Sequence, residues 1–303
     1  MKHRLTGLVP ACYTPMHEDG TLNLDQVPAI VNHLASSGVS ALYVAGTSGE
    51  GASLTGEERR LLAGAFVAAA KGRLPVIVQV GHNSLVESQQ LAEHAQRIGA
   101  DAVSAMPPSY FKPASVDVLV SSMAEIAAAI PGLPFYYYHI PRMTGVVLDM
   151  AEFLDKGSQK IANLVGLKFS DPKASDCQAC VELEGGRFTV LWGLDEMLLS
   201  ALAVGVRGLI GSTYNIAAPL YLRIIKAFEA GDREEARRLQ FLSVQMIRTL
   251  NRHAPFHCSM KIVLKMIGVD CGPCRLPLER PHPEAPARIR KDLEAIGFFQ
   301  WSR

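Results

Sequence analysis

The chain has 303 residues, of which 49% are hydrophobic and 19% are charged, and its formal net charge is +1 at pH 7. This length and composition allow a large buried core and one or two domains. The near-neutral balance gives no reason to expect nucleic acid or an anionic membrane as a partner, and no apolar run approaches the roughly 18 residues of a membrane-spanning helix.

Apolar runs that suit strands alternate along the chain with segments whose apolar residues recur at helical spacing. The predicted strands cover 7–13, 39–45, 74–80, 100–106, 133–138, 161–170, 187–192 and 206–210. The predicted helices between them cover 24–37, 55–71, 84–98, 115–130, 148–156, 173–183 and 195–204. Thr55 with Glu58, and Ser84 with Glu87, have the spacing of a capping box at a helix start.

Repeated strand–helix units of this kind predict an α/β fold, a (β/α)8 TIM barrel. An open doubly wound sheet is the alternative, but no G-x-G-x-x-G follows the first strand. After residue 215 the pattern becomes helical, with helices predicted at 219–229, 233–250, 256–267 and 287–296. We therefore expect a catalytic barrel domain over 1–214 and a C-terminal helical region over 215–303, packed on the barrel or used for oligomerisation.

The predicted strand over 161–170 contains a lysine, Lys168, near its C-terminal end. A run with so little polar alternation suits a strand buried on both faces of a parallel sheet. A lysine there is costly unless it is paired, contacts water or gives up its proton, and the neutral amine is a nucleophile. The alternative is a lysine with a buried stem and a solvated ammonium group.

In a barrel, residues at the C-terminal ends of the strands face the active site. This rule collects a candidate nucleophile, phenols, hydroxyls and carboxylates at one mouth. These candidates are Thr47 and Ser48 after the second strand, Tyr110 after the fourth, Tyr138 and His139 at the fifth, Lys168 and Ser170 at the sixth, Gly193, Asp195 and Glu196 after the seventh, and Ser212 after the eighth.

The turn over 46–49 offers backbone N–H groups and two hydroxyls, which suit a carboxylate, although the same residues also suit an ordinary flexible turn. Asp195 could cap the helix that follows it, and the negative charge of Glu196 could interact favourably with the dipole at the N-terminus of that helix. If both line the mouth, they repel phosphate and accept hydrogen bonds from sugar hydroxyls. This arrangement favours a non-phosphorylated polyol.

Tyr136 and Tyr138 share one face of the fifth strand, because side chains alternate along a strand. Only Tyr138, near the end of the strand, is placed for proton transfer. We interpret the neighbouring His139 as a structural hydrogen-bonding group, although histidine is a common acid–base catalyst.

The six cysteines of this long chain do not indicate a disulfide scaffold. Cys177 with Cys180, and Cys271 with Cys274, form two C-x-x-C pairs that could make a zinc site. The first pair lies in a predicted helix rather than on a knuckle turn, so we expect no metal. Residues 1–7 carry charge but no long apolar segment. We therefore expect no signal peptide and a cytoplasmic location.

Three stretches of the chain resemble the pyruvate-dependent class I aldolases of the dihydrodipicolinate synthase and N-acetylneuraminate lyase family. They are residues 46–51, residues 138–141 with Thr144 and Gly145, and residues 166–170. The resemblance extends from about residue 5 to residue 278 and is strongest to the N-acetylneuraminate lyase branch, through residues 135–141, 193–196 and 211–215.

The resemblance implies reversible cleavage of N-acetylneuraminate to N-acetylmannosamine and pyruvate by a homotetramer. It implies that Lys168 forms a Schiff base, which replaces a metal or other cofactor as the electron sink. It further implies that Tyr138 shuttles the proton. The substrate-binding residues are then Thr47 and Ser48 for the α-carboxylate, Gly193, Asp195, Glu196 and Ser212 for the hydroxylated tail, and Ser170 and Tyr110 as further candidates.

One departure from the family concerns a second carboxylate. The synthases typically carry an arginine where this chain has Met143, and Arg142 stands one residue earlier. This weakens the alternative of a dihydrodipicolinate synthase. An aldolase or dehydratase of another 2-keto-3-deoxy sugar acid stays open, and so does a non-catalytic keto-acid or sialic-acid binding protein. The presence of Lys168 and Tyr138 disfavours the binding protein.

Overall fold

A computed structural model describes residues 5–302. Residues 1–4, part of the segment used to predict the absence of a signal peptide, and Arg303 lie outside the described residues. Among the described residues, no helix combines the length and the apolar character needed to cross a bilayer.

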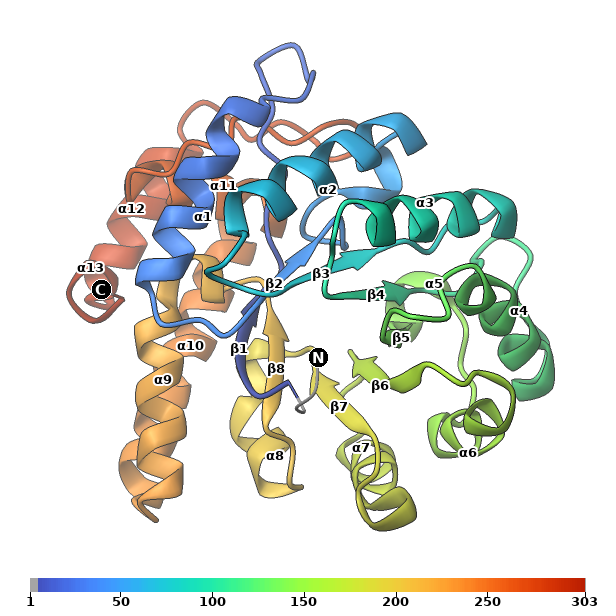
Figure 1. Cartoon of the computed structure of the whole chain (residues 1–303). Coiled ribbons are helices and arrows are strands. Elements are labelled where there is room, and N and C mark those ends of the chain that lie inside the picture. The colour runs from blue at the N-terminus through green and yellow to red at the C-terminus, as the bar shows by residue number, and fades with distance from the viewer. Residues whose placement is uncertain (1–4, 303) are drawn as a thin grey trace.

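The eight strands form a ring of parallel neighbours (Figure 1). They are β1 Gly7–Pro10, β2 Leu42–Val44, β3 Val76–Gln79, β4 Ala102–Ala105, β5 Phe135–His139, β6 Leu164–Phe169, β7 Thr189–Trp192 and β8 Gly208–Gly211. A parallel bridge between Ala11, directly after β1, and Tyr43 in the middle of β2 closes the ring, and Cys12 N donates to Tyr43 O at 2.9 Å. The predicted TIM barrel is therefore confirmed over the open sheet.

The helices surround the strand ring, as expected for βα units. They are α1 Val27–Ser36, α2 Gly56–Ala70, α3 Leu85–Arg97, α4 Val116–Ala128, the short α5 Pro141–Thr144, α6 Met150–Lys160, α7 Ala174–Glu182 and α8 Leu198–Ala203. Most predicted boundaries lie within a few residues of these, whereas α5 was not predicted. The strands are shorter than the predicted runs, because buried loop residues extend each apolar run past the last ladder hydrogen bond.

The C-terminal helices gather on one side of the barrel (Figure 1). They are α9 Tyr214–Glu229, α10 Arg233–His253, α11 Phe256–Met266, α12 Ala285–Ala295 and α13 Phe298–Trp301. α9 begins earlier than predicted, because an irregular residue, Ala217 (φ −147°), lets the chain accommodate Pro219 inside the helix. The division at 214/215 stays a prediction, and it falls in the first turn of α9.

The two predicted capping boxes differ. At Thr55 both hydrogen bonds are present, since Glu58 N donates to the hydroxyl and Thr55 N donates to the Glu58 carboxylate. At Ser84 only the bond from Glu87 N forms. The Glu87 carboxylate instead accepts from Arg60 of α2 at 3.2 Å. The second box is half formed because a charged partner competes for its glutamate.

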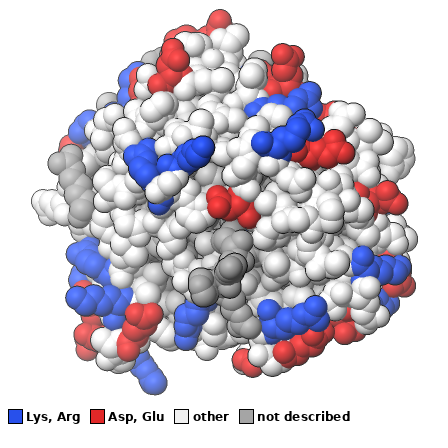
Figure 2. Space-filling model, in the orientation of Figure 1, with Lys and Arg blue, Asp and Glu red and all other residues white. Residues whose placement is uncertain are grey.

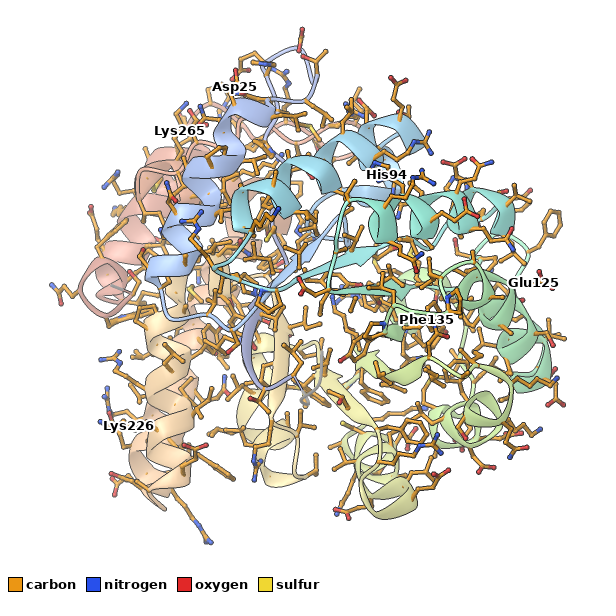
Figure 3. The ribbon with its side chains drawn as sticks, viewed as in Figure 1. Asp25, His94, Glu125, Phe135, Lys226 and Lys265 are labelled. Atoms are coloured by element: carbon orange, nitrogen blue, oxygen red, sulfur yellow. The ribbon has the colours of Figure 1, made fainter. Side chains whose placement is uncertain are left out.

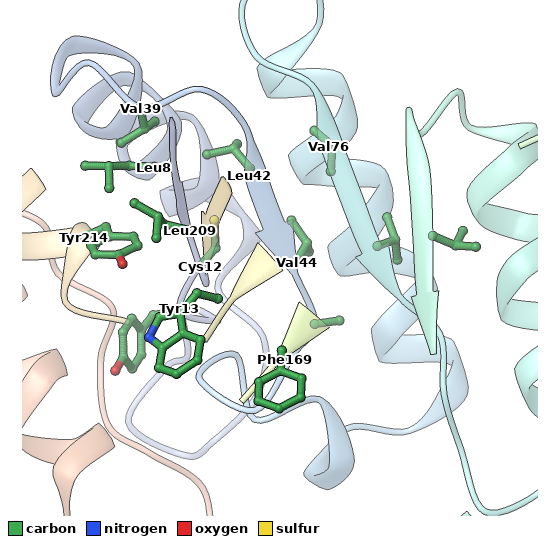
Figure 4. Packing of buried hydrophobic residues seen from close by; sticks show 14 of the residues in the cluster. Leu8, Cys12, Tyr13, Val39, Leu42, Val44, Val76, Phe169, Leu209 and Tyr214 are labelled. Atoms are coloured by element: carbon green, nitrogen blue, oxygen red, sulfur yellow. The ribbon is translucent and has the colours of Figure 1, made fainter. Parts of the chain in front are cut away.

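Two buried apolar clusters follow from the alternation of side chains. One fills the barrel interior and includes Val9, Ala41, Tyr43, Ile77, Tyr136, Tyr138 and Ile210. The other is larger and lies between strands and helices; Figure 4 shows part of it, including Leu8, Val39, Leu42, Leu209 and Tyr214. Tyr136 and Tyr138 thus share the inner face as predicted, while Tyr137 packs outward.

Most charged side chains lie on the surface. In Figure 3 Asp25, Glu125, Lys226 and Lys265 project outward from the helices, whereas Phe135 lies inside. Figure 2 shows basic and acidic residues interspersed on one face, without a large region of a single charge. This distribution agrees with the near-zero net charge.

Candidate active site

Lys168 projects from β6 into the barrel interior, because its neighbours Leu167 and Phe169 pack into the outer cluster. Only 5% of the residue is exposed, so the stem is buried and the side chain is largely withdrawn from bulk solvent. Its Nζ lies 4.0 Å from the ring centroid of Tyr138 and 4.2 Å from that of Tyr43. Among residues 5–302 no carboxylate forms an ion pair with it. Two aromatic faces therefore supply the nearest negative potential.

Tyr43 is a site residue that the sequence analysis missed. Its ring meets that of Tyr138 edge-on, with centroids 5.8 Å apart, and its hydroxyl donates to Ser104 at 3.2 Å. Burial, aided by Tyr138, raises its pKa well above the ordinary value, so the phenol stays protonated. The available signal was the two-residue spacing of Ala41, just before β2, and Tyr43 within it, because residues at this spacing share one face of a strand.

The turn over 46–51 brings two hydroxyls to different sides of the mouth. The hydroxyls of Thr47 and Tyr138 are 3.2 Å apart, and those of Ser48 and Ser212 are 2.6 Å apart. A Cβ on Gly51 would lie 1.9 Å from the Ala45 carbonyl oxygen. The turn folds tightly on itself, so the alternative of an ordinary flexible turn does not fit.

Ser170 offers a buried hydroxyl to the mouth. The residue is 8% exposed, and among the described residues its Oγ has no hydrogen-bond partner. A Cβ at position 193 would lie 1.9 Å from this Oγ, so Gly193 leaves the space that the hydroxyl occupies. Buried polar atoms nearly always have partners. Because the Oγ itself is buried beside Gly193, a ligand contacts it only if neighbouring residues move.

Asp195 is buried and connects the ends of β7 and β8. Its Oδ2 accepts from Thr213 N at 2.7 Å and from Thr213 Oγ1 at 2.6 Å. Burial raises the pKa of Asp195 to about 6, against the opposing effect of these hydrogen bonds. The alternative of a helix cap is wrong, because the cap of the short 3-10 turn Asp195–Met197 is Leu194. Glu196, by contrast, is exposed.

Tyr110 lies apart from the other predicted site residues. It is 78% exposed on the loop after β4 and packs edge-on against Phe111, which is 85% exposed. Asn83 holds this loop by accepting from Ser109 N and Tyr110 N. Within the described chain, the hydroxyl contact of Tyr138 is made by Thr47 and not by Tyr110.

His139 packs on the outer face of β5 between aromatic rings, 6.4 Å from Tyr137 and 5.2 Å from Phe169 by centroid. Burial lowers its pKa to about 4, although Asp171 at 3.7 Å opposes this shift. A neutral, outward-facing imidazole agrees with a structural role.

Met143, at the position where the synthases typically carry an arginine, lies on α5 and is 64% exposed.

The cysteine pairs do not assemble a metal centre in the part of the chain that the structure describes. All six thiols are free, and no group of three or more His, Cys, Asp or Glu residues has the geometry to hold an ion. Cys177 and Cys180 lie on α7, as predicted, and Cys271 and Cys274 follow α11.

Known proteins resemble this chain over nearly its whole length. Residues 4–296 match the dihydrodipicolinate synthetase family. The N-acetylneuraminate lyase of Rattus norvegicus is 40% identical over 304 residues, which cover 99% of this chain and 95% of the rat protein. The solved N-acetylneuraminate lyase from Aliivibrio salmonicida has a TM-score of 0.96 at 38% identity, over 99% of this chain and 100% of that chain. The corresponding enzyme of Proteus mirabilis has a TM-score of 0.95 at 36% identity, over 98% and 100%.

Proposed function

Because the chain belongs to the dihydrodipicolinate synthetase family, we propose that it is a Schiff-base aldolase that cleaves N-acetylneuraminate reversibly to N-acetylmannosamine and pyruvate. One observation carries the chemistry: a buried lysine, Lys168, whose Nζ lies between the faces of Tyr43 and Tyr138 at the barrel mouth. The substrate is supported by the named lyases that align with nearly the whole chain.

Lys168 acts as the nucleophile. Its amine, after losing a proton, attacks the keto carbon of the open-chain sugar acid, and water leaves as the iminium forms. The iminium then accepts the electron pair of the breaking carbon–carbon bond, which yields an enamine of pyruvate. Protonation and hydrolysis release pyruvate and restore the amine. The ring faces of Tyr43 and Tyr138 stabilise the positive charge during the first steps.

Tyr138 moves the proton. As the bond breaks, its hydroxyl accepts the proton of the substrate C4 hydroxyl and passes its own proton to the substrate carboxylate, and both transfers run in reverse in the condensation direction. The Thr47 hydroxyl, 3.2 Å away, holds the phenol oxygen in place. Thr47 and Ser48 also bind the α-carboxylate, which keeps the keto carbon within range of Lys168.

The remaining side chains of the mouth bind the hydroxylated tail. The free hydroxyl of Ser170 and the hydroxyl of Ser212 are donors or acceptors for sugar oxygens. Gly193 keeps the backbone close to the ligand. Asp195 and the exposed Glu196 complete the set by accepting from hydroxyls.

The proposal includes a homotetramer. Tyr110 and Phe111 are large aromatic side chains left open to solvent on one loop, which is typical of a surface that a second copy covers. Light scattering on the purified protein should give four times the mass of the chain. A monomer would remove this part of the proposal and leave Tyr110 without a role. The cytoplasmic location stays a prediction from the sequence.

The test is pyruvate release from N-acetylneuraminate by purified protein and by two variants. Lys168→Ala should abolish both release and borohydride trapping of pyruvate. Lys173→Ala removes a lysine that is largely exposed and should retain both. Labelling of a different lysine would refute the assignment of Lys168. Trapping without release would keep the aldolase chemistry and direct the search to another 2-keto-3-deoxy sugar acid, whereas binding without trapping would support a binding protein.

A further inference from the structure

The turn that carries Thr47 and Ser48 has an unfavourable backbone at its far end. Glu50 adopts a left-handed conformation, with φ +54°, which residues with a Cβ rarely adopt. Its N–H donates to the Thr47 carbonyl at 3.0 Å, so one hydrogen-bonded turn ties the backbone of Glu50 to that of Thr47. Such a conformation persists only where surrounding contacts hold it.

The contacts that hold Glu50 come from the C-terminal helical region. The carboxylate Oε1 lies 2.8 Å from Nζ of Lys261 on α11, and each side chain is only 1% exposed. Oε2 accepts from Arg275 N at 2.7 Å. Lys261 also donates to Pro273 O at 2.7 Å, so the same ammonium group holds the segment after α11.

Arg275 is itself held on the barrel. Its guanidinium donates to both carboxylate oxygens of Glu58 on α2, at 2.9 and 2.7 Å, and to the Ser53 carbonyl at 3.0 Å. The backbone N–H that Glu50 accepts from is thereby fixed relative to α2. The Glu50–Lys261 pair is thus connected on one side to the turn over 46–51. On the other side it is connected to α11 through Lys261 and to α2 through Arg275.

Stability does not explain why two charges are buried here. Removing both ions from water costs free energy that their attraction often fails to recover, and an apolar pair of similar size is frequently as stable. An apolar pair could not accept a hydrogen bond from the Arg275 N–H, and so it could not hold residue 50 in its left-handed conformation in this way. Glu50 follows Thr47 and Ser48 in the same turn, and this position supplies a functional reason for the pair.

We propose that Glu50 is a positioning residue for the substrate carboxylate, and that its buried pair with Lys261 holds Thr47 and Ser48 in register. The C-terminal helical region then supports the keto-acid site, although none of its atoms contacts the ligand. This inference rests on the proposed function, since the carboxylate is the ligand assigned to the turn.

The experiment compares two ketones that differ only in the carboxylate. Borohydride trapping on Lys168 is measured with pyruvate and with acetone, for the unmutated protein, for Glu50→Gln and for the double variant Glu50→Gln/Lys261→Met. Glutamine keeps an acceptor for Arg275 N, and the double variant leaves no unpaired buried charge. Both variants should lose roughly 10- to 100-fold of the preference for pyruvate while trapping acetone as before, a size typical of a misplaced binding group.

Lys265→Met is the matched control, since it removes a largely exposed α11 lysine paired with Asp270 and should leave the preference unchanged. Folded Glu50→Gln or double variants with an unchanged preference would overturn the positioning role, and so would an equal loss with both ketones. If the unmutated protein traps no pyruvate on Lys168, the proposed function itself fails. The two failures are therefore distinguishable.

Discussion

The inner and outer faces of β5 and β6 show how one residue of displacement changes what a buried side chain does. Tyr138 and Lys168 point inward, while Tyr137 and Phe169, each the next residue along, point outward. All four are at most 5% exposed, so burial does not distinguish them. The difference lies in what surrounds them: the inner side chains lie among hydroxyls and the rings of Tyr43 and Tyr138, whereas the outer side chains pack on helices and other rings.

The same comparison holds for the titratable groups. His139 on the outer face is surrounded by rings, and burial lowers its pKa to about 4, which keeps it neutral. Asp195 at the mouth has hydrogen-bond donors beside it, yet burial still raises its pKa to about 6. We therefore expect substitutions on the inner face to affect turnover more than stability. Substitutions on the outer face should affect stability more than turnover.

The largest expected effect comes from Tyr138→Phe on the inner face. Loss of the hydroxyl should lower kcat by roughly 10²- to 10⁴-fold, because a positioned proton-transfer group contributes that much. The free energy of unfolding should fall by only about 1 kcal/mol, the value of the one hydrogen bond to Thr47. Steady-state kinetics and urea unfolding measure both. A kcat within a few-fold of the unmutated value would show that another group transfers the proton.

Phe169→Ala is the matching substitution on the outer face, one residue after Lys168, and should affect stability more than activity. Phe169 is 1% exposed and stacks on Trp192 with centroids 6.0 Å apart. Truncation should lower the free energy of unfolding by about 3–5 kcal/mol through the cavity it leaves. Borohydride trapping of pyruvate per folded molecule should stay within about twofold. A stable variant that no longer traps pyruvate would contradict the division of roles between the faces.

The smallest expected effect is a pH dependence from Asp195. Its folded pKa of about 6 lies above the ordinary 3.8, so between these values the folded state binds more protons than the unfolded state. Stability from this group is therefore full below pH 4 and is lost as pH rises through 6, by about 3 kcal/mol. Asp195→Asn removes the titration and keeps an acceptor for Thr213.

Urea unfolding of both proteins between pH 4 and 7 measures this effect as a difference. The variant should gain stability relative to the unmutated protein as pH rises. A difference that stays constant with pH would show that the carboxyl group titrates normally in the fold.

Local pattern was enough to predict much of the molecule. The βα alternation predicts the barrel, and the two-residue period of β5 predicts that Tyr136 and Tyr138 share a face. The rule that strand ends meet at one mouth collects Lys168, Tyr138, Thr47 and Ser48 from the sequence alone. Each of these properties depends on residues close together in the chain.

Only the tertiary structure decided which distant groups meet. Glu50 and Lys261 are far apart in sequence, as are Asp195 and Thr213, and no local period relates them. The same holds for Tyr43, which resembles any strand aromatic until Lys168 lies across its face. Strand and helix periods arise from backbone geometry over a few residues, whereas ion pairs and ring contacts depend on how closed elements pack. The sequence therefore determined the barrel and pointed to Lys168 as the candidate nucleophile, and packing decided what surrounds and positions that lysine.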